Sequence, residues 1–171
     1  MKVAKIMDND TVNCIDGITV SLFMSGCPHH CKGCFNQETW NKKFGKSYSV
    51  RKVIKLISDK ISKNDVERSF SILGGEPLAP YNIKNTNKII KKIRKIYPNI
   101  TIYLWSGYYL HEIENMKYSD SILSNIDYLI DGRFELDKKQ DYLKLRGSYN
   151  QTIYRINHIN EVNHKIESIN F

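Results

Sequence analysis

Three of the 4 cysteines in this sequence lie within the segment GCPHHCKGC, at Cys27, Cys31 and Cys34. Thiolates at the spacing C-x3-C-x2-C can each bind one iron of a cubane iron–sulfur cluster, whose irons normally take one protein ligand apiece. One iron is then left without a protein ligand. A structural zinc site differs because four protein ligands close it. The cysteine segment alone therefore favours a cluster with one open iron.

A disulfide and a zinc site are the first alternatives for these thiols. A disulfide is disfavoured because closely spaced cysteines in a reducing compartment are more often metal ligands or catalytic thiols. Zinc could take its fourth ligand from His29, His30 or Cys14, although no second Cys or His knuckle follows. We expect the two histidines to lie on the loop surface or to hydrogen-bond near the ligands, not to act as bases. Cys14 is expected to be a half-buried residue of a turn.

Redox and haem chemistry fit the segment less well. A thioredoxin-like pair at Cys31 and Cys34 matches the spacing but leaves Cys27 without a use. A c-type haem is excluded because Phe35 follows Cys34 where a histidine would be required.

A second candidate is Gly74-Gly75-Glu76-Pro77. Two glycines permit a positive φ and let another molecule approach the backbone, and the Glu76 carboxylate can accept hydrogen bonds from an ammonium group. Taken alone, the same residues fit an ordinary turn at the end of a strand.

The elements that must position these residues can be read from the apolar pattern. Runs rich in β-branched and aromatic residues predict strands over residues 3–7, 18–24, 70–73, 100–105, 126–130 and 151–156. Ser49 can cap a helix with one apolar stripe formed by Val50, Val53, Ile54, Ile57 and Ile61. A second helix is predicted over residues 85–97 and ends at Pro98, and a weaker helical stretch with His111 on its surface follows Tyr108. The tail from His158 is too polar for a prediction.

Alternating strands and helices predict right-handed crossovers and a largely parallel sheet with helices on its faces. The loops 26–34, 74–77, 106–108 and 131–134 each follow a predicted strand, so we expect all four to meet at one rim. A complete eight-unit barrel takes about 200–250 residues. The sequence therefore predicts an α/β fold, a partial and open (β/α) barrel, formed by a single domain over residues 1–171.

Composition limits the kinds of binding partner and the cellular compartment that we expect for this protein. The formal net charge is +8, but the densest basic run alternates with isoleucines at helical spacing and predicts the solvent face of an amphipathic helix. The run consists of Lys88, Lys91, Lys92, Arg94 and Lys95. No nucleic-acid-binding motif is present, so no nucleic-acid partner is expected. The sequence shows no secretory signal and no run of about 18 apolar residues, so we expect a cytoplasmic protein without a membrane partner.

Together, GCPHHCKGC and GGEP resemble the motifs of radical S-adenosylmethionine enzymes. The segments SLFMSGCPHHCKGCFNQETW, ILGGEPL, SGY, LIDGRFE and RGSYNQ follow in the order seen in the enzymes that activate anaerobic, class III ribonucleoside-triphosphate reductases. These segments run from about Ser21 to Gln151. The combination of DGRF with RGSYNQ is the specific part, since three cysteines alone indicate only the superfamily.

The resemblance implies a radical-SAM oxidoreductase with a [4Fe-4S] cluster and S-adenosylmethionine as cofactors. An electron, from a donor such as flavodoxin, would reach the cluster and cleave the sulfonium of S-adenosylmethionine. The resulting 5′-deoxyadenosyl radical would remove a hydrogen from a backbone glycine of the reductase large subunit. No side chain is expected to act as an acid or base, because the radical takes the hydrogen and the cofactor supplies the difficult chemistry.

The resemblance also assigns residues, position by position. The cluster ligands would be Cys27, Cys31 and Cys34. The adenosine side would be lined by Gly33, Cys34 and Phe35, and the methionine end would be held by Gly74, Gly75 and Glu76. Further residues match the motifs without an assigned contact: Ser106 and Tyr108 at the rim, and Asp131, Arg133, Arg146 and Asn150.

Two departures from the family pattern stand out. Gly33 occupies a position that is aromatic in many superfamily members, but the activating enzymes tolerate glycine there, which favours the narrower family. Residues 13–17 replace a usual glycine-proline-glycine turn, and Thr19 stands where an arginine is common.

Two other functions compete with this one. The first is the activation of a different glycyl-radical enzyme, or another reaction of a small radical-SAM enzyme. The second belongs to another class, a non-enzymatic binding module stabilised by zinc.

Overall fold

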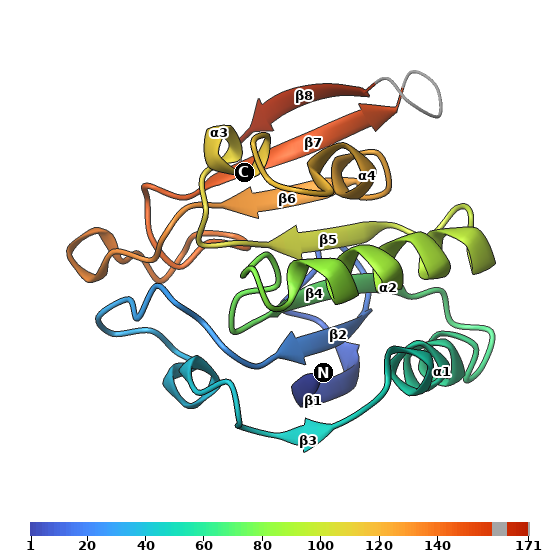
Figure 1. Ribbon diagram of the computed structural model, residues 1–171. Helices are drawn as coiled ribbons and strands as arrows, with labels where there is room; N and C mark the ends of the chain where they lie inside the picture. Colours follow the sequence, from blue (N-terminus) through green and yellow to red (C-terminus); the bar gives the residue numbers. More distant parts are fainter. Residues whose placement is uncertain (159–163, 171) are drawn as a thin grey trace.

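The computed structural model describes residues 1–158 and 164–170. Within these residues, eight strands form one mixed sheet in the order β3-β1-β2-β4-β5-β6-β7-β8 (Figure 1). The strands are β1 Lys2–Asp10, β2 Thr19–Met24, β3 Lys46–Ser47, β4 Ser69–Gly74, β5 Ile102–Trp105, β6 Tyr128–Asp131, β7 Thr152–His158 and β8 His164–Ile169. The α/β class is confirmed, and the six strands predicted from the sequence are all present with shifted ends.

The sheet is less parallel than predicted. Only the neighbours β2·β4, β4·β5 and β5·β6 pair in parallel, whereas β1, β3, β7 and β8 join the sheet antiparallel. The connections between strands explain the antiparallel pairs, because two neighbouring strands can be parallel only when a long crossover, usually a helix, joins them. Between β6 and β7 the chain forms only the 3-10 helix Leu136–Lys138, so β7 returns antiparallel to β6. The strands β3 and β8 were not predicted.

The helices are α1 Val50–Ile61, α2 Ile83–Ile96, α3 Leu110–Ile113 and α4 Ser119–Leu123. Ser49 caps α1 as predicted, since its side chain accepts a hydrogen bond from the backbone N–H of Lys52. Figure 1 shows α1, α2 and α4 against one face of the sheet. Their apolar stripes form the main core with the sheet residues that face them, among them Val53, Ile57, Ile90, Ile72 and Leu104.

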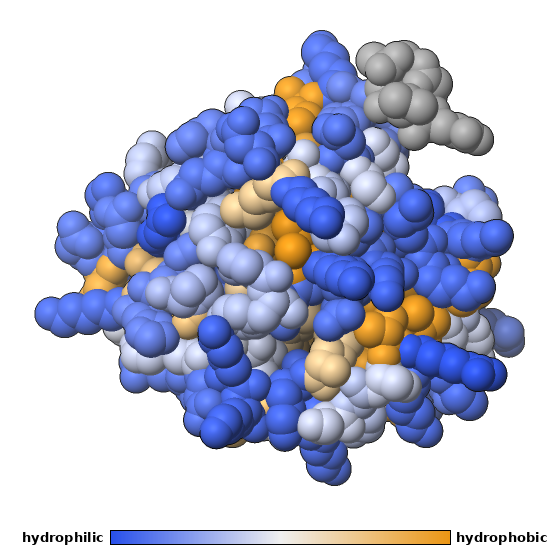
Figure 2. Space-filling view, in the orientation of Figure 1, coloured by the Kyte–Doolittle hydropathy of each residue, from blue (hydrophilic) through white to orange (hydrophobic). Residues whose placement is uncertain are grey.

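The basic run of α2 faces solvent, as predicted, at Lys88, Lys91, Lys92 and Lys95. Figure 2 shows this helical face as mostly hydrophilic, with small apolar areas. Arg94 is different, because its guanidinium is half-buried and lies 2.6 Å from the Asp127 carboxylate. The same carboxylate accepts the N–H of Ile102 at 2.7 Å, so Arg94 helps to fix the starts of β5 and β6.

The turn after β1 covers part of the sheet face that carries no helices. Asp10 is 4% exposed, and its carboxylate accepts hydrogen bonds from the N–H of Val12 at 2.9 Å and the hydroxyl of Ser21 at 2.6 Å. Cys14 is fully buried in this turn, more than the half-burial predicted, and packs in a small cluster with Tyr103 and other residues of this face. Residues 13–17, which depart from the family pattern, therefore form a turn that buries Cys14 against this face and leaves Asp16 and Gly17 exposed.

The core of α2 gives a first prediction. Replacing Ile90 by Ala should lower the free energy of unfolding by about 2–5 kcal/mol, because the side chain is fully buried and its loss leaves a cavity. Ile96, in the same helix but 41% exposed, is the matched control, and its replacement by Ala should change stability by at most about 0.5 kcal/mol. Denaturant unfolding of the two variants measures this difference, and equal losses would contradict the burial.

The turn after β1 gives a prediction that depends on pH. Burial raises the pKa of Asp10, but hydrogen bonds from Asn13, Ser21 and Val12 outweigh it and hold the pKa below its ordinary value of 3.8. A lowered pKa stabilises the fold above pH 3.8, and this contribution is lost as the pH falls through the folded-state pKa. Asp10→Asn should cost about 1–3 kcal/mol at neutral pH and should flatten the loss of stability in acid.

The control for this experiment lies in the same turn. The Asp16 side chain is 90% exposed, so Asp16→Asn should leave both the stability and its acid dependence close to those of the parent. Urea titrations between neutral pH and pH about 3 separate the two variants. An Asp10→Asn protein with an unchanged acid profile would show that the carboxylate is not held by these bonds.

Candidate functional site

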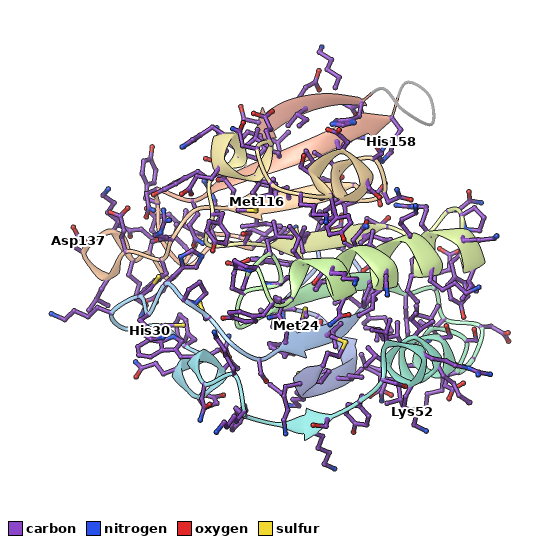
Figure 3. All side chains as sticks on the ribbon, viewed as in Figure 1. Met24, His30, Lys52, Met116, Asp137 and His158 are labelled. Carbon is purple, nitrogen blue, oxygen red and sulfur yellow. The ribbon has the colours of Figure 1, made fainter. Side chains whose placement is uncertain are left out.

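The four loops singled out in the sequence meet at the carboxyl ends of the parallel strands, as predicted (Figure 1). The cysteine loop, residues 26–34, follows β2, and the glycine turn, residues 74–77, follows β4. The N–H of Glu76 donates to the carbonyl of Gly26 at 2.8 Å, and the N–H of Gly132 donates to the carbonyl of Tyr108 at 3.2 Å. Figure 3 shows His30 of the cysteine loop and Asp137 of the segment after β6 at this same end.

The glycine turn is shaped by its contact with the cysteine loop. Gly74 has a φ of +101°, a conformation that glycine permits. A Cβ on Gly75 would lie 2.7 Å from the carbonyl oxygen of Gly26, closer than real Cβ atoms come to a backbone oxygen. The two glycines thus let the backbones of the two loops pack directly together.

The cysteine loop holds three unpaired thiols. Cys27, Cys31 and Cys34 are partly exposed and form no disulfide. The loop is folded back by hydrogen bonds from the N–H of Cys27 to the carbonyl of Trp40 at 3.2 Å and from the N–H of Cys34 to the carbonyl of Cys31 at 3.1 Å. The three thiols are therefore presented from one ordered loop.

Burial affects the acidity of these thiols. It raises the pKa of Cys27 to about 11, with a smaller upward effect from the Glu76 carboxylate, and it also raises the pKa of Cys31. Both thiols are protonated at neutral pH in the metal-free protein. Metal ligation requires thiolates, so loading a metal here must release protons.

The donor set fits an iron–sulfur cluster. Within the part of the chain that the structure describes, no three His, Cys, Asp or Glu side chains are grouped around a point where one ion would sit. A cubane cluster does not need such a grouping, because each thiolate binds a different iron. Cys14 cannot complete a site with the other thiols, since β2 lies between Cys14 and Cys27 and puts them at opposite ends of the sheet.

The Glu76 carboxylate lies at the centre of the rim and is 1% exposed. Its Oε1 accepts hydrogen bonds from the N–H of Leu78 at 2.8 Å and the hydroxyl of Ser106 at 2.9 Å. Its Oε2 accepts the N–H of Gly107 at 2.7 Å and lies 3.0 Å from Nε2 of His29. We call these five residues the Glu76 network. Sequence reasoning selected Glu76 but did not anticipate that the carboxylate joins three loops.

The three histidines flagged in the sequence occupy different environments. The His29 side chain is only 6% exposed and contacts Glu76, so it is not a surface residue but one that hydrogen-bonds near the predicted ligands. His30 is exposed and stacks on Trp40 with ring centroids 4.9 Å apart. His111 is on the surface, as predicted.

The remaining motif residues contact the chain itself. Asp131 is 2% exposed and accepts the N–H of Leu110 at 2.6 Å, and burial raises its pKa. Arg133 lies 3.1 Å from Glu112, a partner that the sequence reading missed although Glu112 stands in the first turn of α3. Asn150 donates to the carbonyl of Arg133 at 2.8 Å. The bonds of Asp131 and Arg133 tie this segment to α3. The bond from Asn150, with one from Arg146 to the Gln151 carbonyl, folds the segment between β6 and β7 back on itself.

An apolar contact joins the end of the cysteine loop to the segment after β6. Phe35 is 75% exposed and its ring centroid lies 6.2 Å from that of Phe134. A Cβ on Gly33 would lie 2.8 Å from the Leu136 side chain, so the segment after β6 touches the cysteine loop here. Leu136 was not selected from the sequence, where it is one apolar residue in a polar stretch.

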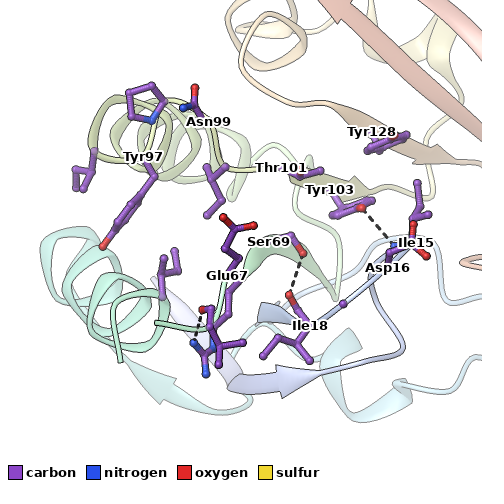
Figure 4. Close-up of a pocket in the computed structure, with 17 residues that line it drawn as sticks. Ile15, Asp16, Ile18, Glu67, Ser69, Tyr97, Asn99, Thr101, Tyr103 and Tyr128 are labelled. Atoms are coloured by element: carbon purple, nitrogen blue, oxygen red, sulfur yellow. Dashed lines mark hydrogen bonds between the residues drawn. The ribbon is translucent and has the colours of Figure 1, made fainter. Parts of the chain in front are cut away.

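A large hollow lies at the other end of the sheet. This cavity of about 800 Å³ is lined by residues at the amino ends of the parallel strands, among them Ser69, Tyr103 and Tyr128. Figure 4 shows Glu67 and Tyr97 around it. None of the site residues predicted from the sequence lines this cavity, so size alone does not locate the site.

Comparison with known proteins first shows the class of protein to which this chain belongs. The family model described as a 4Fe-4S single cluster domain matches residues 16–154, which include the three clustered cysteines, the glycine turn and the motifs after β6. This match covers most of the chain.

The relatives narrow the class further, because three of them carry the name anaerobic ribonucleoside-triphosphate reductase-activating protein. The protein of Vibrio cholerae is 36% identical over 81% of this chain and 88% of its own length. That of Pasteurella multocida is 34% identical over 91% of this chain and 98% of its own, and that of Enterobacteria phage T4 is 34% identical over 81% and 84%. The chain belongs to the family of anaerobic ribonucleoside-triphosphate reductase-activating proteins. Among its described residues, no helix has the length and apolar character of a membrane span.

Proposed function

We propose that this protein is the radical-SAM enzyme that activates an anaerobic ribonucleoside-triphosphate reductase by forming a glycyl radical on it. The observation that carries the proposal is the set of three unpaired thiols on one ordered loop, hydrogen-bonded directly to the glycine turn. A [4Fe-4S] cluster held by these thiols would supply the electron for reductive cleavage of S-adenosylmethionine, the chemistry needed to remove a hydrogen from a backbone glycine of the reductase.

The residues of this chain would bind and orient the two cofactors. Cys27, Cys31 and Cys34 would each hold one iron, which leaves the fourth iron for the cofactor. Backbone hydrogen bonds already hold the cysteine loop in place, so little ordering is needed when the cluster binds. No protein acid or base is required at this site.

The two ends of S-adenosylmethionine would lie on different loops. Gly74, Gly75 and Glu76 would hold the methionine end, because the glycine turn packs against the start of the cysteine loop. Gly33, Cys34 and Phe35 would line the adenosine side, where the exposed ring of Phe35 offers an apolar face to a planar base.

The proposal includes the finer description of the fold. One open sheet with parallel central strands, and active loops at their carboxyl ends, is consistent with a partial (β/α) barrel of the radical-SAM type. The hydrogen-bonded contact between the loops after β2, β4 and β5 supports a single functional domain over residues 1–171.

The proposed partners are the large subunit of the reductase and an electron donor such as flavodoxin, in the cytoplasm. The reductase must bring a glycine close to the cysteine loop. Exposed apolar side chains at this end support such a contact, since clustered exposed aromatic residues are typical of interfaces. They are Phe35, Leu136 and Tyr149.

Metal loading tests the ligand assignment. Anaerobic reconstitution with iron and sulfide should give a brown protein with about four irons per chain. Cys27→Ser, Cys31→Ser and Cys34→Ser should each lose most of the iron and all reductive cleavage of S-adenosylmethionine, because each removes one ligand. Cys14→Ala is the matched control and should keep its iron, since Cys14 lies at the other end of β2. The assays are iron analysis, product chromatography and electron paramagnetic resonance of the reductase glycyl radical.

Two results would contradict the proposal. The first is a colourless protein that binds one zinc per chain and takes up no iron, which would support a zinc-stabilised module. The second is a protein that cleaves S-adenosylmethionine but forms the radical only on a different glycyl-radical enzyme and not on the reductase.

A further inference from the structure

We infer that His29 is a positioning residue that fastens the cysteine loop to the Glu76 carboxylate and so orders the rim. The inference rests on the proposed function, because the two loops that His29 joins are those assigned to the cluster and to the methionine end. It adds a role for His29, to which the proposed function assigns none.

The first step is the hydrogen-bonding capacity of Glu76. An ionised carboxylate offers about four acceptor positions. Four donors already occupy them, namely the N–H groups of Leu78 and Gly107, the Ser106 hydroxyl and the His29 imidazole. With 1% exposure, the side chain has no open side. The contact with His29 is therefore one of the four that keep this buried charge paired.

The second step is the chemistry of the His29 contact. An ionised carboxylate can only accept, so Nε2 of His29 must carry the proton and donate across the 3.0 Å contact. The ring is also held by Tyr108, whose ring centroid lies 4.5 Å away in an edge-on arrangement. His29 lies between Cys27 and Cys31, so fixing its ring fixes the part of the loop that carries the first two thiols.

The third step is the space beside Gly107, which the His29 ring fills. A Cβ at this position would overlap the His29 ring and would lie 2.8 Å from its Nε2. Gly107 does not have a positive φ, so alanine is compatible with its backbone. The glycine is therefore needed because of the space that His29 takes. Gly107→Ala should push the ring away from Glu76 without removing any atom of the network.

These contacts define a thermodynamic cycle. His29→Ala and Gly107→Ala should each weaken S-adenosylmethionine binding to the cluster-loaded protein by about tenfold or more, the size expected when a buried hydrogen bond to a charged group is lost. The double variant should bind no worse than His29→Ala alone, because the alanine at position 107 then has no ring to displace. All three should keep the iron content of the parent, since the thiols are untouched.

Two controls separate positioning from general damage. His30→Ala removes the neighbouring imidazole, which is exposed and stacks only on Trp40 within the contacts described, and it should leave binding unchanged. His29→Gln places an N–H donor at a similar reach and should restore most of the lost affinity. Thermal unfolding of each variant shows that the fold is retained.

A readout on the cluster-free protein makes the test independent of the proposed function. Amide hydrogen exchange of residues 26–34 and of Gly107 should become about tenfold faster in His29→Ala, as expected for the loss of a buried hydrogen bond. If the parent binds no S-adenosylmethionine, the proposed function fails while this exchange still decides the role of His29.

Several outcomes would overturn the inference. Unchanged exchange in His29→Ala would show that the contact does not order the loop. Losses that add in the double variant would show that Gly107 acts independently of His29. Full affinity for S-adenosylmethionine in His29→Ala would show that its contact with Glu76 does not position the loops for cofactor binding.

Discussion

The rim depends on one buried negative charge. A carboxylate that is 1% exposed is tolerated only when hydrogen bonds replace the water it has lost. Glu76 obtains them from the cysteine loop through His29, from the loop after β5 through Ser106 and Gly107, and from its own turn through Leu78. Each donor has to stay in place for the charge to remain paired. Moving any of these loops would leave the buried charge with too few hydrogen bonds, so the Glu76 network holds the three loops in one arrangement.

This arrangement depends in turn on the parallel strands. Three neighbouring parallel strands end at the same edge, so the loops after β2, β4 and β5 start side by side. Gly74 and Gly75 then allow the glycine turn to touch the backbone of Gly26, and a side chain at Gly75 would prevent it. The sheet brings the loops close together, the glycines let them touch, and the carboxylate fixes their relative positions.

The sequence predicted the features that follow from local patterns. The cysteine spacing, the capped helix at Ser49 and the turn at Gly74 are each determined by neighbours in the chain, and the meeting of the loops follows from the geometry of parallel strands. At the sheet edges, β3 and β8 were not predicted, because β3 has two residues and the tail that contains β8 is polar. The strands β1 and β7 were predicted, but their antiparallel direction was not. The contact of His29 with Glu76 joins positions 47 residues apart, and nothing in either residue's neighbourhood indicates the other. Whether a histidine between cysteines lies on the surface or is buried is decided by that distant partner.

The same carboxylate also shapes the chemistry of the thiols. Burial is the main cause of the raised pKa of Cys27, and the charge of Glu76 raises it further. A negative group near the first thiol opposes additional negative charge and favours a cation at this rim. S-adenosylmethionine carries a positive sulfonium and an ammonium group, so its charge suits this field even though the carboxylate has no acceptor position left. A carboxylate that organises the loops by hydrogen bonds can thus still attract the cofactor at a distance, because electrostatic attraction does not require direct contact.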